Sequence, residues 1–281
     1  MTPGIPRMPA FFGRQGGPRQ LVAGAGRHDN AAGRTQLSWV TMRAQAEHLA
    51  PLLPRGFELG EPLIIVEAVS LQELPWLAGR GYDLVTVSMP VVFTAQGRRT
   101  PGRMELVTWE NLADPIISGR EELGFSKVFA DTIVRESSDD PHAVRWIVAW
   151  GGTKFLEIDL TLTGPLTEPP AWREGPVFHY RVLPRTGAWG QTEVEQVTAD
   201  TQAPSSMTAV SAQRGFGTVR FTPATFSQLP TLVHVVNVLA GLSLSPADDA
   251  GHLELNGWSD AADMRIVASW PVEPPSIHEL P

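Results

Sequence analysis

Short stretches of alternating or continuous apolar residues, separated by turns rich in Gly, Pro and Asp, run along most of the chain. They contain many β-branched and aromatic residues, a pattern typical of strands. We therefore predict ten strands between residues 63 and 222, and two closing strands at 252–258 and 264–270. The ten are Leu63–Leu71, Leu84–Phe93, Arg103–Trp109, Val128–Val134, Ala143–Trp150, Lys154–Thr163, Val177–Leu183, Thr192–Val197, Met207–Ser211 and Thr218–Thr222.

Helical patterns are few. Thr41 is placed to cap a helix over Met42–Leu53, and a second helix is predicted over Phe226–Leu239 with Gly241 as its stop. We find no strand–helix–strand alternation and no internal repeat, so the pattern predicts an α+β fold that is mainly antiparallel β. Many short strands in one block indicate a closed or highly curved sheet with a few flanking helices.

The domain organisation follows from the same pattern. Residues 1–36 are rich in Gly, Pro and Arg and have no periodicity, so we expect an irregular N-terminal arm. Residues 37–270 form one predicted domain, and residues 271–281 form a Pro-rich tail.

Composition narrows the classes of function. A net charge of -8 without long charged runs argues against a nucleic-acid partner. The absence of cysteine excludes disulfides and thiolate chemistry, and the seven histidines show no metal-ligand spacing. Gly24-Ala25-Gly26 is too incomplete for a dinucleotide loop, so we predict no metal and no cofactor. Without a signal pattern or an apolar run of ~20 residues, the interpretation is a cytoplasmic protein with no membrane partner.

Lysine usage is the first hint of chemistry. The chain has twenty arginines but only two lysines, Lys127 and Lys154. Guanidinium does not deprotonate in proteins, so chemistry that needs a neutral amine cannot use arginine instead. In a strand, Phe125, Lys127 and Phe129 share one face, and poor hydration between two rings would favour the neutral amine. A lysine at a strand edge with its ammonium in solvent is the alternative, and Lys154 has no predicted role.

Glu67 is the second candidate. It lies in the apolar run from Pro62 to Val69, which is typical of a strand covered on both faces. A carboxylate there must be paired, hydrogen-bonded or protonated. The residues alone leave two hypotheses open: a group that transfers protons, and an ion pair with one of the arginines.

The segment Asp114–Lys127 resembles the acetoacetate decarboxylase superfamily, whose members have an acidic residue, Pro, two small or apolar residues, Gly-Arg-Glu and then aromatic-Pro-Lys. Weaker similarity is found in Leu53–Pro62, Tyr82–Phe93 and Tyr180–Pro184, so that the resemblance covers about residues 35–255. It implies a closed, cone-like antiparallel β-structure that assembles into homo-oligomers.

The resemblance also implies roles for individual residues. Lys127 takes the position of the Schiff-base nucleophile towards a keto acid, and Glu67 that of an acidic residue at the active site. Tyr82 would supply an acid or a hydrogen bond to an oxyanion. Substrate binding is assigned to three residues, which are Arg120, Phe125 and Arg34, the last lying beside the position of an N-terminal arginine in the family.

The chain departs from the decarboxylase pattern at several positions. Val128 replaces a second lysine, Ser126 replaces the proline before the nucleophile, and Leu84 replaces a second glutamate, with Asp83 on the opposite strand face. The imine machinery is thus retained without the parts adapted to acetoacetate.

We therefore predict a lyase that uses an iminium and an enamine on Lys127 for aldol condensation and dehydration of a small keto acid with an aldehyde, in the manner of secondary metabolism. The alternatives are an acetoacetate decarboxylase that releases CO2, and a non-catalytic small-molecule binding protein on the same fold.

Overall fold

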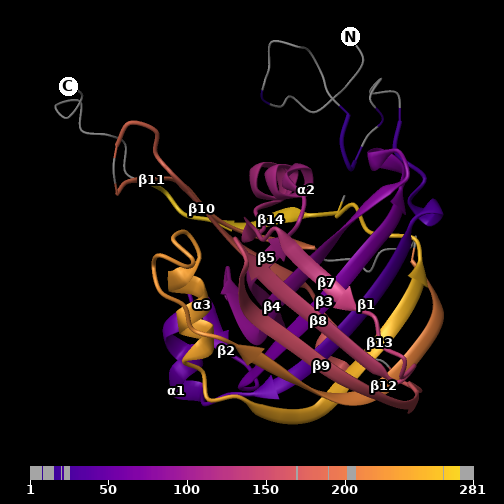
Figure 1. Ribbon diagram of the computed structural model, residues 1–281. Helices are drawn as coiled ribbons and strands as arrows, with labels where there is room; N and C mark the ends of the chain where they lie inside the picture. Colours follow the sequence, from indigo (N-terminus) through magenta and orange to yellow (C-terminus); the bar gives the residue numbers. More distant parts are fainter. Residues whose placement is uncertain are drawn as a thin grey trace.

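The computed structural model describes residues 8, 16–19, 21, 26–168, 170–188, 190–200, 207–261 and 263–272 (Figure 1). Strands dominate these residues. They are β1 (Arg34–Arg43), β2 (Phe57–Leu59), β3 (Leu63–Leu74), β4 (Arg80–Ala95), β5 (Arg98–Glu110), β6 (Lys127–Phe129), β7 (Thr132–Glu136), β8 (Ala143–Trp150), β9 (Thr153–Pro165), β10 (Val177–Pro184), β11 (Thr192–Asp200), β12 (Thr208–Phe221), β13 (Ser245–Asn256) and β14 (Arg265–Ser269). The helices are α1 (Ala46–Leu49), α2 (Ala113–Ser118) and α3 (Val233–Ala240), with a π-helical turn after α2 and short 3-10 helices elsewhere.

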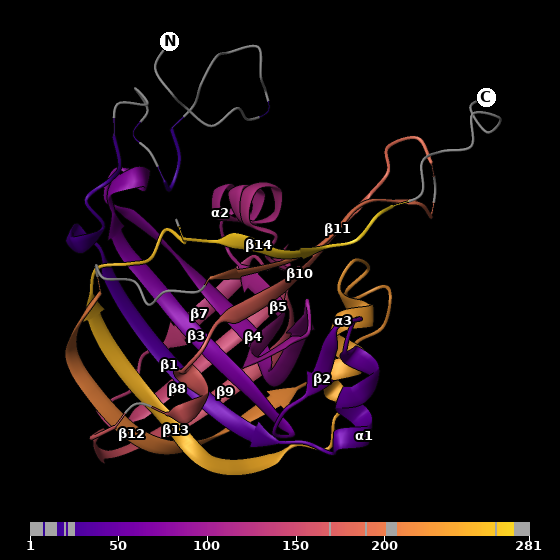
Figure 2. The ribbon, with the colours of Figure 1, turned by 180° about the vertical axis from the view of Figure 1, so that it is seen from behind.

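The strands form a single sheet of 14 members in the described part of the chain, in the order β14-β11-β10-β5-β4-β3-β1-β13-β12-β9-β8-β7. β2 pairs with β4, and β6 pairs with β5. Two contacts, β10 with β5 and β5 with β6, are parallel, and the others are antiparallel. From behind, α1, β2 and α3 gather on one flank of the curved sheet (Figure 2).

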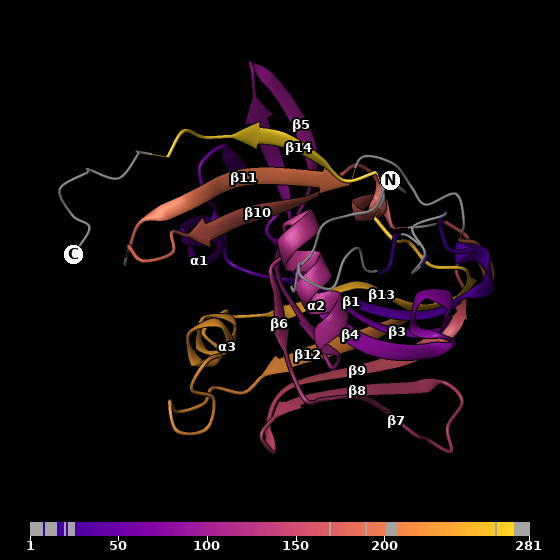
Figure 3. The ribbon, with the colours of Figure 1, turned by 90° about the horizontal axis from the view of Figure 1, so that it is seen from above.

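The prediction of a mainly antiparallel, strongly curved sheet is confirmed. The sheet does not close into a barrel, because β14 and β7 lie at opposite ends of its order and do not pair in the described residues. Seen from above, α2 lies between the two ends of the sheet, with β10, β11 and β14 on one side and β7, β8 and β9 on the other (Figure 3). Helix α2 belongs to the segment that carries Lys127, and the strand that follows it, β6, pairs with β5.

Several predicted boundaries were wrong. The helix over Met42–Leu53 is shorter: Met42 and Arg43 are the last two residues of β1, α1 covers four residues, and a 3-10 turn follows. The strand Val128–Val134 is split into β6 and β7, and helix α2 was not predicted. β12 joins the two strands predicted at Met207–Ser211 and Thr218–Thr222.

The division into an arm, one domain and a tail stays a prediction. Much of the arm over 1–36 and most of the tail over 271–281 lie outside the described residues. Within the described arm, β1 begins at Arg34, two residues before the predicted boundary at 36. None of the helices in the described part of the chain is long and apolar enough to span a bilayer.

Strand alternation gives the sheet two different faces. On β4, Val85, Val87 and Met89 point into the main apolar core, as Val107 and Trp109 do on β5. The alternate residues point to the other side. That side carries polar groups, and it faces the cavity described next.

Candidate active site

A cavity of about 270 Å³ lies against the polar face of β3, β4 and β5. Helix α2 and the β6 segment form another wall, and residues of the arm, of β10 and β11, and of the β13–β14 loop contribute the rest. Lining residues from the sheet and the lysine segment are Glu67, Leu71, Tyr82, Leu84, Thr86, Ser88, Arg103, Glu105, Thr108, Glu110, Pro115, Ser118, Gly119, Leu123, Phe125, Lys127, Val177, His179 and Asp200. All of the predicted catalytic residues therefore reach one cavity.

Helix α2 and its π-helical extension bring Lys127 into place. The extension Gly119–Leu123 ends at Gly124, whose φ of 87° lies in the left-handed region that favours glycine. The chain then enters β6, which pairs in parallel with β5 so that Lys127 lies opposite Thr108. The segment Asp114–Lys127 thus consists of a helix and a sharp turn, and it ends at the first residue of a strand.

The Gly-Arg of the motif acts on Lys127 directly. A Cβ added at Gly119 would lie 2.6 Å from Cδ and 2.9 Å from Nζ of Lys127, so any other residue here would displace the lysine side chain from its present position. Arg120 donates from Nη1 to the backbone carbonyl of Lys127 at 2.9 Å. The sequence assigned Arg120 to substrate binding, but it does not line this cavity; it holds the strand from outside.

The amine of Lys127 is nearly enclosed, with a side chain 11% exposed. Nζ lies 2.8 Å from Oε1 of Glu110, donates to the carbonyl of Pro115 at 3.2 Å, and lies 4.9 Å from the ring centroid of Phe125. The expected second ring is absent because Phe129 is 43% exposed. A carboxylate, rather than two aromatic rings, is the main partner of the amine.

Glu110 is fully buried. Its approach to Lys127 is not aligned as a hydrogen bond, and neither carboxylate oxygen has another hydrogen-bond partner among the described residues. Burial raises the pKa of Glu110; the attraction of Lys127 opposes this shift, and the nearby charge of Glu105 adds to it. The result is a carboxylate that can take up a proton next to a lysine.

Glu105 has the opposite behaviour. Burial raises the pKa of Glu105, but the attraction of His179, a contact with Thr108 and the charge of Lys127 outweigh burial, so the pKa is below its usual value. Glu105 and Glu110 are five positions apart, which in a regular strand would place them on opposite faces. A bulge at Leu106, where Val87 pairs with Val107 and Ser88 with Glu105, turns both towards the cavity.

Glu67 lines the cavity but does not contact Lys127. It is buried on β3 and forms an ion pair with Arg103, while Nη1 of Arg173 lies 3.8 Å from its Oε1. The register places Glu67, Thr86, Thr108 and Lys127 in one row across four strands. Three strand spacings of ~4.8 Å put the two ends about 14 Å apart along the sheet. The ion pair, one of the two hypotheses, is what the structure shows.

Tyr82 is buried and lines the cavity on β4. Burial and the charge of Glu110 raise its pKa well above the usual value, and Arg19 lowers it only in part. Tyr82 is therefore a neutral phenol near neutral pH, able to donate a hydrogen bond. Leu84 also lines the cavity, directly opposite Glu110 in the β4–β5 pairing.

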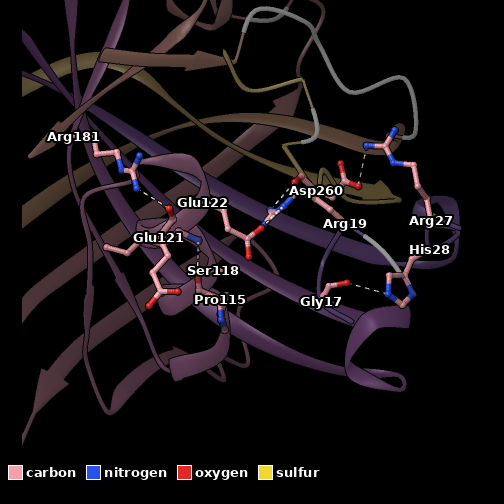
Figure 4. A network of polar contacts seen from close by, with 11 residues as sticks. Gly17, Arg19, Arg27, His28, Pro115, Ser118, Glu121, Glu122, Arg181 and Asp260 are labelled. Atoms are coloured by element: carbon pink, nitrogen blue, oxygen red, sulfur yellow. Dashed lines mark hydrogen bonds and ion pairs between the residues drawn. The ribbon is translucent and has the colours of Figure 1, made fainter. Parts of the chain in front are cut away.

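Arg34 lies away from the cavity. It is exposed at the start of β1, and its Nε is 3.1 Å from Oε2 of Glu73. Among the described residues of the arm, Arg19 is the arginine that reaches the cavity. It donates to Oε2 of Glu122 at 3.0 and 2.6 Å and to the carbonyl of Asp260 at 3.1 Å (Figure 4). Two further contacts lie in this region. Arg27 donates to the carboxylate of Asp260, and Nε2 of His28 contacts the carbonyl oxygen of Gly17 (Figure 4).

Sequence reasoning missed Glu110, Glu105, His179 and Arg19. Glu105 and Glu110 lie in or directly after a predicted strand, but simple alternation cannot bring both to one face. His179 and Arg19 reach the cavity only through contacts between distant parts of the chain. Phe125 lines the cavity, and its role in substrate binding stays a prediction.

Among the described residues, no group of three or more His, Asp or Glu side chains is arranged to hold a metal ion.

Comparison with known structures shows the same fold. The acetoacetate decarboxylase from Legionella pneumophila is 18% identical, with a TM-score of 0.66 over 85% of this chain and 88% of that one. An acetoacetate decarboxylase-like enzyme from Sphingomonas wittichii is 18% identical, with a TM-score of 0.63 over 91% and 100%. The enduracididine biosynthesis enzyme MppR, complexed with the condensation product of pyruvate and imidazole 4-carboxaldehyde, is 17% identical, with a TM-score of 0.59 over 83% and 87%.

Among the curated protein sequences compared with this chain, none matches. The sequence model of the family described as acetoacetate decarboxylase, however, matches residues 7–256. This range includes every residue that lines the cavity except four in the β13–β14 loop, which are Trp258, Ser259, Asp260 and Ala261. On this match over most of its length, the chain belongs to the acetoacetate decarboxylase family.

Proposed function

We propose that this protein is a lyase that forms a Schiff base between Lys127 and a small keto acid. The observation that carries the proposal is the nearly enclosed Lys127 amine, 2.8 Å from a fully buried carboxylate in a cavity of small-molecule size. A nucleophilic lysine needs a nearby group that accepts its proton, and Glu110 has a pKa raised by burial for that exchange.

The first steps follow from these two groups. Glu110 takes a proton from Lys127, and the neutral amine attacks the ketone carbon. A proton of the adduct nitrogen moves to the former carbonyl oxygen, and Glu110 gives its own proton to the same oxygen. Loss of water then leaves Glu110 as a carboxylate and gives an iminium, which draws electrons from the adjacent carbon. Glu110 then lies beside the positive nitrogen and can remove a proton from that carbon, giving the enamine.

For the fate of the enamine we favour addition to an aldehyde, followed by dehydration. The support is the replacement of decarboxylase residues by Val128 and Leu84, together with the pyruvate–aldehyde condensation product held by MppR on a similar fold. Tyr82, a neutral phenol, would donate a hydrogen bond to a developing oxyanion. Phe125 would form an apolar wall beside the imine.

The substrate carboxylate needs a cation, and we assign this role to Arg19 in place of Arg34. Arg19 lines the cavity, and its charge acts on Tyr82. A guanidinium recognises a carboxylate through two parallel hydrogen bonds, which a bound substrate would take over from Glu122.

Borohydride trapping tests the proposal. The protein is incubated with acetoacetate, with pyruvate, or with pyruvate and imidazole 4-carboxaldehyde, then reduced and mapped by peptide mass. We expect a label on Lys127 and none on Lys154. A Lys127→Arg variant should take no label, whereas Lys154→Arg should behave like the original protein.

The competing functions predict different results. Rapid CO2 release from acetoacetate would favour the decarboxylase and contradict the aldol preference. A non-catalytic binding protein would give no trapped adduct with any keto acid, and its ligand binding would be unchanged in Lys127→Arg.

A further inference from the structure

The mechanism proposed above uses one of the two carboxylates near Lys127. The other, Glu105 on β5, lies beside His179 on β10, where the parallel register pairs Val177 with Arg103 and Phe178 with Met104. Both side chains line the cavity, and both are buried. A buried ionisable pair in a cavity wall is a candidate for function.

The two groups face each other loosely. His179 Nδ1 lies 3.6 Å from Oε1 of Glu105, beyond hydrogen-bonding distance, and neither atom has a hydrogen-bond partner among the described residues. Hydrogen bonds of catalytic groups are often this long until substrate binds. Because Nδ1 faces the carboxylate, Nε2 is the ring nitrogen that remains for another group.

Phe125 connects this pair with the nucleophile. Its ring stacks on the imidazole of His179 with centroids 3.9 Å apart, and its centroid is 4.9 Å from Nζ of Lys127. The amine and the imidazole therefore share one aromatic neighbour. His179 thus lies in the part of the cavity next to Phe125, where it would meet a second reactant.

The two carboxylates differ in their charge behaviour. The pKa of Glu110 is raised and that of Glu105 is lowered. Carboxylates whose surroundings move their pKa values apart take different roles in a site. Glu110 is suited to exchange protons, whereas Glu105 stays charged and is suited to orient the imidazole.

Building on the proposed Schiff-base function, we propose that His179 is a second acid–base group, which protonates the carbonyl oxygen of an aldehyde as the aldehyde adds to the enamine on Lys127. Glu105 is its positioning residue. The enamine carbon bonds to the aldehyde carbon, the π pair of the aldehyde moves to its oxygen, and that oxygen takes the proton from Nε2. The nitrogen lone pair re-forms the iminium, and the proton that Glu110 took to form the enamine is released and restores His179 through solvent.

Three readouts separate this step from those before it. Borohydride trapping with pyruvate measures the imine, exchange of the pyruvate methyl hydrogens in D2O measures the enamine, and product formation from pyruvate and the aldehyde used above measures addition. They are applied to the original protein, His179→Gln and Glu105→Gln. His142→Gln, at an exposed histidine outside the cavity, is the matched control.

We expect His179→Gln to slow condensation by at least about 100-fold while trapping and exchange stay near the original rates. Glu105→Gln should reduce condensation less, again without loss of trapping. Equal losses in all three readouts would make His179 a structural residue and overturn the inference, as would unchanged condensation. So would an original protein that traps pyruvate and exchanges its hydrogens but never adds the aldehyde. Absence of trapping in the original protein would instead defeat the proposed function itself.

Discussion

The chain has two lysines, and each lies next to a glutamate that is almost inaccessible to solvent. Nζ of Lys127 is 2.8 Å from Glu110, and Nζ of Lys154 is 2.7 Å from Glu157. By distance and partner the two pairs are equivalent. They differ in their surroundings, since Lys154 is 45% exposed whereas Lys127 is 11% exposed.

The two glutamates respond in opposite ways. Glu157 accepts hydrogen bonds from Lys154, Arg145 and Arg220, and these contacts hold its pKa at about 2 despite burial. Glu110 has one cation and no aligned hydrogen bond among the described residues, so burial raises its pKa. The comparison teaches that ion-pair distance alone does not distinguish the pair proposed to be catalytic from the other pair. The number of compensating charges and the loss of hydration distinguish the two pairs.

The largest expected difference between the pairs comes from exchanging each lysine for arginine. Lys127→Arg keeps a positive charge near Glu110 but cannot form an imine, so turnover and borohydride labelling should fall to background. Lys154→Arg keeps the cation next to Glu157 and should leave both unchanged. Turnover and labelling with pyruvate check this, and labelling of Lys154 would reverse the assignment.

Neutralising each glutamate should separate chemistry from stability. Glu110→Gln removes the proton acceptor, and exchange of pyruvate methyl hydrogens should slow by about 10²–10⁴-fold. Glu157→Gln should leave exchange intact and lower the free energy of unfolding by about 1–2 kcal/mol, a modest loss because its three cations are exposed. Urea unfolding together with NMR exchange rates gives both numbers. A slow Glu157→Gln variant would show that the two pairs are coupled.

Crowding the first pair without touching its charges should have a smaller effect. In Gly119→Ala the new Cβ meets the Lys127 side chain at 2.6 Å, while the backbone φ of -66° accepts alanine. A displacement of about 1 Å costs up to about 100-fold, so pyruvate trapping should slow by that order. Ile117→Ala on the exposed side of the same helix is the control. Equal trapping rates in the two variants would mean that Gly119 is not needed for space.

The smallest effect is expected in the pH dependence of stability, and for the second pair its direction is set by the lowered pKa of Glu157. The folded pKa of Glu157, about 2, is below its ordinary value of 4.5, so its contribution is present above pH 4.5 and is lost as pH falls towards 2. With solvent screening this is up to about 2 kcal/mol. Unfolding curves from pH 7 to 3 should show a shallower loss below pH 4.5 in Glu157→Gln than in the original protein.

A different group, His252, should reduce the free energy of unfolding in a higher pH range than Glu157 does, as the pH is lowered. Burial, with a smaller effect of Arg135, lowers the pKa of His252 to about 4, so stability should fall between pH 6.5 and 4 as the unfolded chain takes up the proton. Ser38 contacts Nδ1 of this buried histidine at 3.0 Å. If Glu157→Gln changed the curve in this upper range instead, the assignment of the two pH ranges would be wrong.

Local patterns were sufficient for most strands, because alternation and turn residues act over a few positions. They failed at β1 and at Met42, where the pairing of residues 34–43 with both β3 and β13 decides the conformation. They failed again at β6 and β7, where the chain leaves β5 at Ala130 to begin a different edge of the sheet.

The amino-acid sequence by itself determined which lysine to suspect, since Gly119, Arg120 and Lys127 lie within nine residues and form a local helix, turn and strand. Only the tertiary structure decided its partners. The carboxylate next to the amine is that of Glu110 and not that of Glu67, because strand register places Glu67 three strands away. A bulge at Leu106 turns Glu105 towards the same cavity. Register and bulges depend on pairing between distant segments, and no local pattern of residues encodes them.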